Sequence, residues 1–378
     1  RDKGVRFMPI WGRQAYKIGG MFKFWGGLTV ESVGGGPGLV EALTKISRKN
    51  KVTVAYGARA IGLIADDDGV KGVRVKHDGR TVEVKARGVV LAAGGFQANT
   101  EMRTRYLGPG WELAKIRGTR FNTGDAINMA LEIGAMPTGN WSGGHAVAWD
   151  RNAPETGDLT VGDNFQKHSY PWGIMINANG ERFLDEGSDF RNYTYAKNGR
   201  ISRMQPKHVG YQVFDNKIIP MLRDEYRIKR VTKIRANTLE ELCQKMEDVN
   251  AEKALATIKE YNKAVMTEVK FDPNVKDGRG TRGLAIPKSN WANTVDEPPF
   301  EAYAVTCGLT FTFGGLKIDT SARVIDSDGA AIPGLFATGE LVGGIFWFNY
   351  PGGTGLMNGA VFGKIAGATA GQRAKQSP

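Results

Sequence analysis

The sequence contains only two cysteines among 378 residues and has no long apolar run. Cys243 and Cys307 are too few for a disulfide framework and do not form a CxxC pair, so we expect a reducing, cytoplasmic location. No stretch approaches the roughly 18–20 apolar residues that a membrane helix needs, and we expect no membrane span. The 41% hydrophobic and 24% charged residues are ordinary for a folded globular chain and exclude general disorder.

The formal net charge is +12, because 51 Lys and Arg face 39 Asp and Glu. A balance of this size fits nucleic acid, an acidic membrane surface or small anions as partners. The basic residues are spread along the chain and no nucleic-acid motif is present, so we expect no nucleic-acid partner. Attraction for a small anionic substrate or cofactor and a merely solvated basic surface remain equal alternatives. No metal site is expected.

The sequence pattern that indicates secondary structure changes twice along the chain. Residues 34–134 have an α/β pattern: a glycine-led helix after residue 34, then short strands at Val52–Tyr56, Ala60–Ala65 and Gly72–Val75. Residues 141–304 are less regular and include a helix that begins at Thr238 with a capping box to Glu241. From Thr306 the α/β pattern returns. The expected domains are therefore 1–140, a capping module at 141–304, and a return to the first domain at 305–378.

Two buried strands end in glycines, VVLAAGGF (89–96) and GLFATGE (334–340). Glycine at the carboxyl end of a parallel strand lets backbone N–H groups approach a planar or phosphorylated ligand closely. Either motif taken alone is equally consistent with an ordinary turn between a strand and a helix. Their combination and order carry the argument further.

Six stretches occur in the order found in the fumarate reductase/succinate dehydrogenase flavoproteins, and the chain resembles that family over nearly its whole length. They are AAGGFQANTEM (92–102), NTGDAINMALEIGA (122–135), NANGERFLDE (177–186), IKEYNKAV (258–265), TFTFGGLKID (310–319), and IPGLFATGE with NYPGGTGLMNGAVFGKIAG (332–367). The resemblance implies a Rossmann-like α/β FAD-binding domain with an inserted α+β capping domain.

The resemblance also implies how FAD is held. Glu340 would bind the ribityl or ribose hydroxyls of FAD, although a helix-capping carboxylate is the alternative. Backbone N–H groups at a helix N-terminus would face the flavin pyrimidine edge, where the helix dipole favours negative charge. The cofactor-binding residues implied are Ala93, Gly94, Gly95, Asp125, Gly339, Glu340, Gly353, Thr354, Gly355 and Leu356.

One expected feature is missing from the sequence. A Rossmann-type flavoprotein begins with a strand, a GxGxxG turn and an acidic residue for the ribose. The nearest candidate, residues 34–38, is interrupted by Pro37 and follows no buried strand. We therefore expect the opening βαβ unit to lie outside this chain, which leaves FAD occupancy of the chain by itself open. A companion chain that supplies this unit is a possible partner.

In the family, hydride moves between flavin N5 and one carbon of a C–C bond, and an arginine moves the proton on the neighbouring carbon. Arg191 is the candidate here, offset by one residue from the simplest alignment; a structural ion pair is the alternative. Its high ordinary pKa requires a low-dielectric site. His145, between glycines and aromatics in WSGGHAVAW, matches the histidine that binds the substrate carboxylate, or is a structural histidine.

Two departures from the fumarate reductase pattern bear on the substrate. Thr310 stands where those enzymes have a histidine, and Tyr350 stands where they have an arginine that forks onto a carboxylate. The FNYPGGTGL form resembles tricarballylate dehydrogenases, so a small tricarballylate-like carboxylate is the expected substrate and Tyr350 a catalytic residue. A 3-ketosteroid dehydrogenase, or a non-catalytic piece that needs a partner chain, are the alternatives. Because no ferredoxin or haem motif is present, the electron donor or acceptor is expected to be separate.

Overall fold

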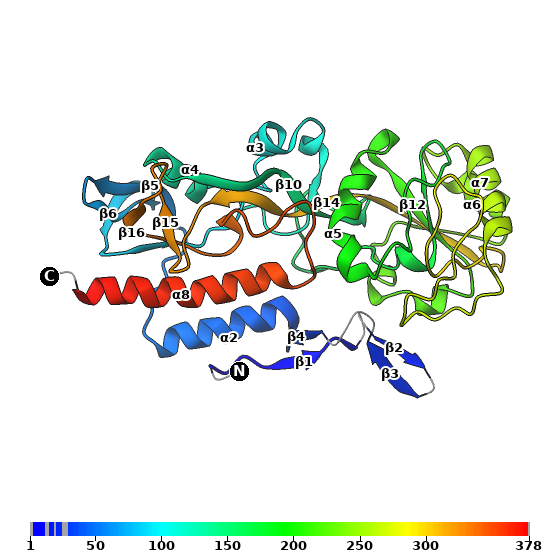
Figure 1. The fold of residues 1–378 in the computed structure, drawn as a ribbon, viewed down its shortest axis with the longest axis horizontal. Helices are drawn as coiled ribbons and strands as arrows, with labels where there is room; N and C mark the ends of the chain where they lie inside the picture. The colour runs from blue at the N-terminus through cyan, green and yellow to red at the C-terminus, as the bar shows by residue number, and fades with distance from the viewer. Residues whose placement is uncertain (1–2, 12–14, 19, 25–28, 377–378) are drawn as a thin grey trace.

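The computed structural model describes residues 3–11, 15–18, 20–24 and 29–376, and its elements run along an elongated molecule (Figure 1). At the N-terminal end, two small antiparallel pairs precede a helix. They are β1 (Phe7–Pro9) with β4 (Val30–Ser32), and β2 (Ala15–Ile18) with β3 (Met21–Phe24). Helix α2 (Gly35–Lys49) follows directly, which confirms the glycine-led helix expected after residue 34.

The three-stranded sheet that carries the glycine motifs has the order β15–β16–β8 (Arg323–Ile325, Ala331–Ala337, Val89–Leu91). Strands β16 and β8 are parallel, with Leu335 opposite Val89 and Ala337 opposite Leu91. Helix α8 (Thr354–Gln376) contacts both strands. β8 has no further partner strand within the described residues. Parallel pairing through distant segments is what the Rossmann-like prediction requires.

A second three-stranded sheet is an antiparallel meander of β5 (Arg59–Asp66), β6 (Gly69–His77) and β7 (Arg80–Lys85). β5 and β6 confirm the strands expected at Ala60–Ala65 and Gly72–Val75. The strand expected at Val52–Tyr56 is wrong: these residues form no strand, and the Tyr56 side chain is 81% exposed. Without a neighbouring strand to complete its hydrogen bonds, an apolar alternation does not become a strand.

The largest sheet joins the two ends of the molecule. Its long antiparallel strands are β10 (Pro137–Asp150) and β14 (Phe300–Leu316). They run from the part with the glycine motifs into the part with helices α6 (Leu239–Lys245) and α7 (Ala251–Ala264) (Figure 1). The remaining strands pair as β12 and β13 on β14, β11 on β12, and β9 parallel to β14. Their bounds are Lys115–Ile116 (β9), Ile174–Asn177 (β11), Gly210–Phe214 (β12) and Lys233–Ala236 (β13).

Helices α5 (Arg191–Arg203), α6 (Leu239–Lys245) and α7 (Ala251–Ala264) belong to the inserted module. Of the two hydrogen bonds in the expected capping box, the one to the Thr238 side chain is confirmed, since the Thr238 hydroxyl oxygen accepts from the Glu241 N–H at 3.1 Å. α6 and α7 pack against β11–β14 in one core, in which Ile258 of α7 joins Ile174 and Val213 of the strands. Shorter helical turns are α3 (Thr100–Met102), η1 (Arg103–Leu107), η2 (Trp111–Leu113), η3 (Tyr170–Trp172), η4 (Pro206–His208), η5 (Ile219–Met221), η6 (Asp224–Tyr226) and η7 (Gly339–Leu341); α4 spans Asp125–Glu132.

Strands β10 and β14 cross residues 141 and 304, where the sequence texture changes. The α/β layer with the glycine motifs and the α+β layer with α6 and α7 therefore share one continuous pair of strands. The domain limits 1–140, 141–304 and 305–378 stay a prediction. In the part of the chain that is described, no helix combines the length and the apolar content needed to cross a bilayer.

Candidate active site

The two glycine-ended strands finish side by side. The Thr338 N–H donates to the Leu91 carbonyl at 3.0 Å, immediately after the paired strands β16 and β8. Beyond that point Gly95 packs against the side chains of Thr312 and Glu340, so that a Cβ built on Gly95 would lie 2.2 Å from Thr312 Oγ1 and 2.5 Å from Glu340 Oε1. Any side chain at 95 would displace the Thr312 hydroxyl and the Glu340 carboxylate. The two motifs found separately in the sequence form one surface.

Glu340 lies at the centre of this surface, and its carboxylate is held by the protein. Oε1 accepts from the Thr312 N–H at 2.8 Å, and Oε2 accepts from the side-chain amides of Gln97 at 3.2 Å and Asn122 at 3.3 Å. Burial raises the pKa of Glu340 to about 7, against the lowering effect of these donors. The carboxylate thus ties together three segments that meet at the strand ends.

The remaining residues expected to hold FAD surround the same strand ends. Gly339 and Gly353 have φ of +82° and +87°, and a Cβ on Gly353 would meet no atom within 4 Å. The Gly355 N–H, in the first turn of α8, donates to the Tyr350 hydroxyl at 2.8 Å, and the Thr354 hydroxyl donates to the Pro351 carbonyl. Leu356 is exposed.

A flat cofactor fits this surface. Ala92 and Ala93 are exposed beside the strand ends, and the α8 side presents Leu356 and Met357, both more than half exposed. Apolar surface of this kind beside open glycine backbone is suited to cover by a planar ligand. Donors at the N-terminus of a 23-residue helix add a preference for negative charge. The residues present therefore fit FAD.

Asp125 and Ala93 line the same small cavity. A cavity of about 300 Å³ is lined by Ala92, Ala93, Asp125 and Arg59, among others. The Asp125 carboxylate accepts from Arg59 Nε at 3.0 Å and Nη2 at 2.8 Å, and from the Thr123 hydroxyl. Gly94, with φ +76°, packs its Cα face on the Asn122 side chain. Asp125 is thus an ion-paired wall residue of this smaller cavity.

A larger cavity of about 800 Å³ holds two of the three expected catalytic residues, His145 and Tyr350. Their rings stack at 4.5 Å between centroids with an interplanar angle of 8°. His145 is buried, and neither ring nitrogen has a hydrogen-bond partner among the described residues. Burial, with Arg117 and Arg191 nearby, lowers the pKa of His145 well below its ordinary value. The ring is therefore neutral at pH 7 and can donate one N–H to a ligand.

Arg191 begins helix α5 behind this cavity. Its guanidinium lies 5.0 Å from the ring centroid of Tyr195, one helical turn further on, and Tyr195 meets His145 edge-on at 4.9 Å. Burial, and then the like charge of Arg223, lower the pKa of Arg191 to about 9. The structure brings Arg191, His145 and Tyr350 into one cluster linked by Tyr195.

Several residues of this cluster have no local sequence signature. Tyr195 and His168 pack against each other at 5.1 Å, and His168 is buried with both ring nitrogens without partners among the described residues. Arg223 and Glu225 form a buried ion pair at 3.0 Å. Arg117 lines the large cavity. The i, i+4 spacing of Arg191 and Tyr195 is the one signal that could have been used; the others come together only through tertiary contacts.

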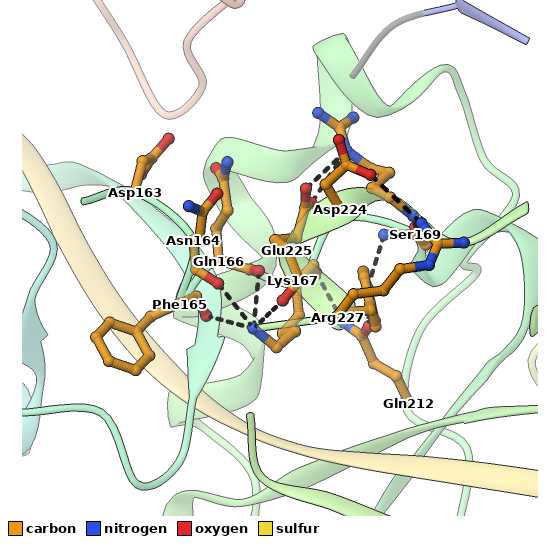
Figure 2. Close-up of polar contacts among 12 residues, drawn as sticks. Asp163, Asn164, Phe165, Gln166, Lys167, Ser169, Gln212, Asp224, Glu225 and Arg227 are labelled. Carbon is orange, nitrogen blue, oxygen red and sulfur yellow. Dashed lines mark hydrogen bonds and ion pairs between the residues drawn. The ribbon is translucent and has the colours of Figure 1, made fainter. Parts of the chain in front are cut away.

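A buried lysine fixes the segment that carries His168. Figure 2 shows the carbonyl oxygens of Asn164, Phe165 and Gln166 converging on the Lys167 ammonium, at 3.1–3.2 Å, with the Glu225 carbonyl at 3.1 Å. Burial lowers the pKa of Lys167 to about 8, while Asp150, 3.9 Å away, opposes this effect. The Lys167 ammonium thus holds the loop of residues 164–167 against η6, behind the cavity.

Comparison with known proteins agrees with this geometry. A family model described as an FAD binding domain matches residues 18–356. The NADH:acrylate oxidoreductase of Vibrio harveyi is 32% identical over 338 residues, 88% of this chain and 32% of that protein. The fold matches an open flavocytochrome c3 fumarate reductase with a TM-score of 0.71 at 26% identity, over 99% of this chain and 61% of that one. A 3-ketosteroid delta1-dehydrogenase from Sterolibacterium denitrificans matches with a TM-score of 0.69 at 25% identity, over 90% and 63%.

The paired glycine ends and the capping layer define a flavoprotein fold. The chain belongs to the FAD binding domain family, and within it to the fumarate reductase/succinate dehydrogenase flavoproteins. Both the family and the Rossmann-like domain with a capping domain are thereby confirmed, with FAD as the cofactor that the family implies. The chain spans about a third of the first relative and less than two thirds of the two solved structures.

Proposed function

We propose that the protein is an FAD-dependent dehydrogenase or reductase that acts on a C–C bond next to a carboxylate, with a tricarballylate-like polycarboxylate as substrate. The observation that carries the proposal is the buried cluster in which Arg191 lies against Tyr195, which packs on His145 and so reaches the cavity wall at Tyr350. A guanidinium withdrawn from water beside a cavity can exchange a proton with a bound molecule.

The residues have distinct roles in this proposal. Bound FAD would supply the two-electron acceptor or donor. Arg191 moves the proton on the carbon beside the one that exchanges hydride, and its lowered pKa makes both protonation states reachable. His145, neutral at pH 7, donates to the substrate carboxylate. Tyr350, whose oxygen accepts from the Gly355 N–H, directs its own proton at the substrate.

For the cofactor, we propose that Ala93, Gly94, Gly95, Gly339 and Gly353 offer backbone contacts and that Thr354, Gly355 and Leu356 face the flavin. Glu340 acts on FAD by holding together the segments of Thr312, Gln97 and Asn122, whose three donors already reach its carboxylate. Asp125 would lie near the isoalloxazine ring, with Arg59 fixing its orientation.

A 3-ketosteroid dehydrogenase is the second candidate. The aromatic part of the cavity wall, Trp149, Tyr195, Phe311 and Tyr350, favours it, because a tyrosine hydroxyl beside apolar rings suits a carbonyl on an apolar skeleton. Two arginines, Arg117 and Arg120, line the same cavity and favour an acid. The buried cluster adds a third cation, so we retain the carboxylate as the leading substrate.

The proposal also covers the electron partner, the location, the domain limits and a companion chain. Electrons come from or go to a separate donor or acceptor, and the location is cytoplasmic. The domain limits at residues 140 and 304 are retained. A companion chain that completes FAD binding, without which this chain is inactive, is the third candidate. FAD binding by the purified chain without any partner would exclude it.

The experiment uses FAD-loaded protein under anaerobic conditions and records the flavin absorbance band with tricarballylate, succinate and a 3-ketosteroid. Bleaching by tricarballylate and not by the steroid is the expected result. Bleaching by the steroid alone establishes the second candidate. If neither changes the oxidised flavin, the reduced flavin is mixed with the unsaturated counterpart of each compound, and failure there as well contradicts the proposal.

A further inference from the structure

Arg117 is placed at the cavity by a short parallel pairing. Strand β9 pairs with Gly308 and Leu309 of β14, and the Arg117 N–H continues this ladder by donating to the Leu309 carbonyl at 2.9 Å. The side chain then lies next to Thr310, and both residues line the 800 Å³ cavity. The pairing thus fixes the backbone of Arg117 beside the cavity.

The guanidinium of Arg117 is oriented by Asp163 and Gln166, which belong to the loop next to Lys167. Asp163 accepts from Nε at 2.6 Å and from Nη2 at 2.8 Å, and Gln166 Oε1 accepts from Nη2 at 3.2 Å. Burial opposes the charge of Arg117, but Asp163 outweighs it and raises the pKa of the guanidinium. The N–H groups of Nε and Nη2 thus all have acceptors, and the guanidinium stays charged.

The opposite end, Nη1, remains for a ligand. One of its two N–H bonds donates to Thr310 Oγ1 at 3.2 Å, and the other has no partner among the described residues. Because the Thr310 oxygen accepts this bond, its own hydroxyl proton is available to donate elsewhere. Arg117 and Thr310 together therefore offer two adjacent donors into the cavity, one of them charge-assisted, which suits a carboxylate.

The charges around the cavity favour such an anion. Asp158 is already paired with Arg230 at 2.5 Å, and Asp163 with Arg117. Five arginines face three carboxylates in or behind these walls: Arg117, Arg120, Arg191, Arg223 and Arg230 against Asp158, Asp163 and Glu225. Residues 310 and 350 are uncharged. A bound anion would offset an existing excess of positive charge.

We propose that Arg117 and Thr310 bind a second, distal carboxylate of the substrate, apart from the C–C bond handled by Arg191, His145 and Tyr350. The inference rests on the proposed function and makes it more specific: the pair selects polycarboxylates over compounds that carry one carboxylate fewer. Asp163 and Gln166 are positioning residues for Arg117. No local motif in the sequence marks this pair.

The test compares two ligands that differ by one group. Methylsuccinate is tricarballylate without one terminal carboxylate, and calorimetric titration of the FAD-loaded protein gives the affinity for each. A charge-assisted hydrogen-bonding pair predicts that tricarballylate binds about 10- to 100-fold more tightly. Arg117→Gln abolishes this preference and Arg117→Lys retains part of it. Arg235→Gln, which removes the same charge from an exposed position on β13 outside the cavity lining, preserves it.

Thr310→Val provides a second variant if Arg117→Gln does not fold, and it lowers the preference by removing one donor. The inference is overturned if wild-type protein binds both ligands equally or neither, or if Arg117→Gln keeps the full preference. A preference that depends on Arg117 without any flavin chemistry supports this site and contradicts the proposed reaction. Turnover of tricarballylate, together with an unaltered preference in Arg117→Gln, supports the proposed reaction and contradicts this site.

Discussion

Replacing Arg191 tests the proton-moving role most sharply. The pKa of its guanidinium is lowered from 12.5 to about 9, chiefly by burial. The uncharged form at pH 7 therefore rises to about one molecule in a hundred, against about one in 300,000 for an ordinary arginine. Proton donation during reduction requires the charged form, so the rate falls tenfold per pH unit above about 9. In the dehydrogenation direction the uncharged form accepts the proton, and the rate rises towards that pH.

The assay is kcat of the FAD-loaded enzyme between pH 7 and pH 10.5 with a saturating polycarboxylate. Arg191→Gln lowers kcat by about 10²- to 10⁴-fold, the usual loss on removing a general acid or base. Arg191→Lys recovers part of the rate with a displaced pH profile. Lys197→Gln removes a cation from the same helix, α5, and leaves both kcat and the profile unchanged. A flat wild-type profile across pH 9, or Arg191→Gln with near-normal kcat, would refute the role of Arg191.

Three further predictions concern the strand ends and the cavity wall. Gly95→Ala destabilises the protein by about 1–3 kcal/mol in thermal unfolding and weakens FAD binding, because the new Cβ would lie 2.2 Å from Thr312 Oγ1. The control Gly359→Ala, inside α8, is neutral or stabilising, because its new Cβ would lie 3.9 Å from the nearest atom, the Gly339 Cα. Burial raises the pKa of Glu340 from 4.5 to about 7, so its contribution to stability is complete below about pH 4.5 and is lost as the pH rises through 7. In Glu340→Gln, the free energy of unfolding measured between pH 5 and 8 therefore loses this pH dependence, which amounts to up to about 3 kcal/mol. Tyr350→Phe lowers kcat more than ligand affinity and costs about 1 kcal/mol of stability, because the Gly355 N–H loses its acceptor at 2.8 Å.

Much of the fold could be predicted from local pattern. The two glycine-ended strands, the capping box at Thr238 and the glycine-led helix at residue 35 each depend on a few neighbouring residues. Their order along the chain then indicated the family. The parallel pairing of β8 with β16 follows from that order, although about 240 residues separate the strands in sequence.

The rest depends on contacts that sequence patterns do not record. Val52–Tyr56 alternates like a strand but pairs with no strand among the residues that the structure describes. Arg117 reaches the cavity because β9 pairs with β14, nearly two hundred residues further along the chain. Buried Lys167 would be expected on the surface, since an unpaired buried ammonium is costly. Four converging carbonyl oxygens make its burial possible.

The central claim is that the cavity lined by His145 and Tyr350, with Arg191 behind it, holds a carboxylate substrate against bound FAD. Anaerobic rapid mixing of the FAD-loaded protein with tricarballylate, deuterated at the carbons of the reacting bond or not, tests it most directly. The account predicts that the flavin band bleaches, more slowly with the deuterated compound, and that Arg191→Gln suppresses the bleaching. Flavin that stays oxidised, or bleaching at equal rates with both compounds and unaffected by Arg191→Gln, would contradict it.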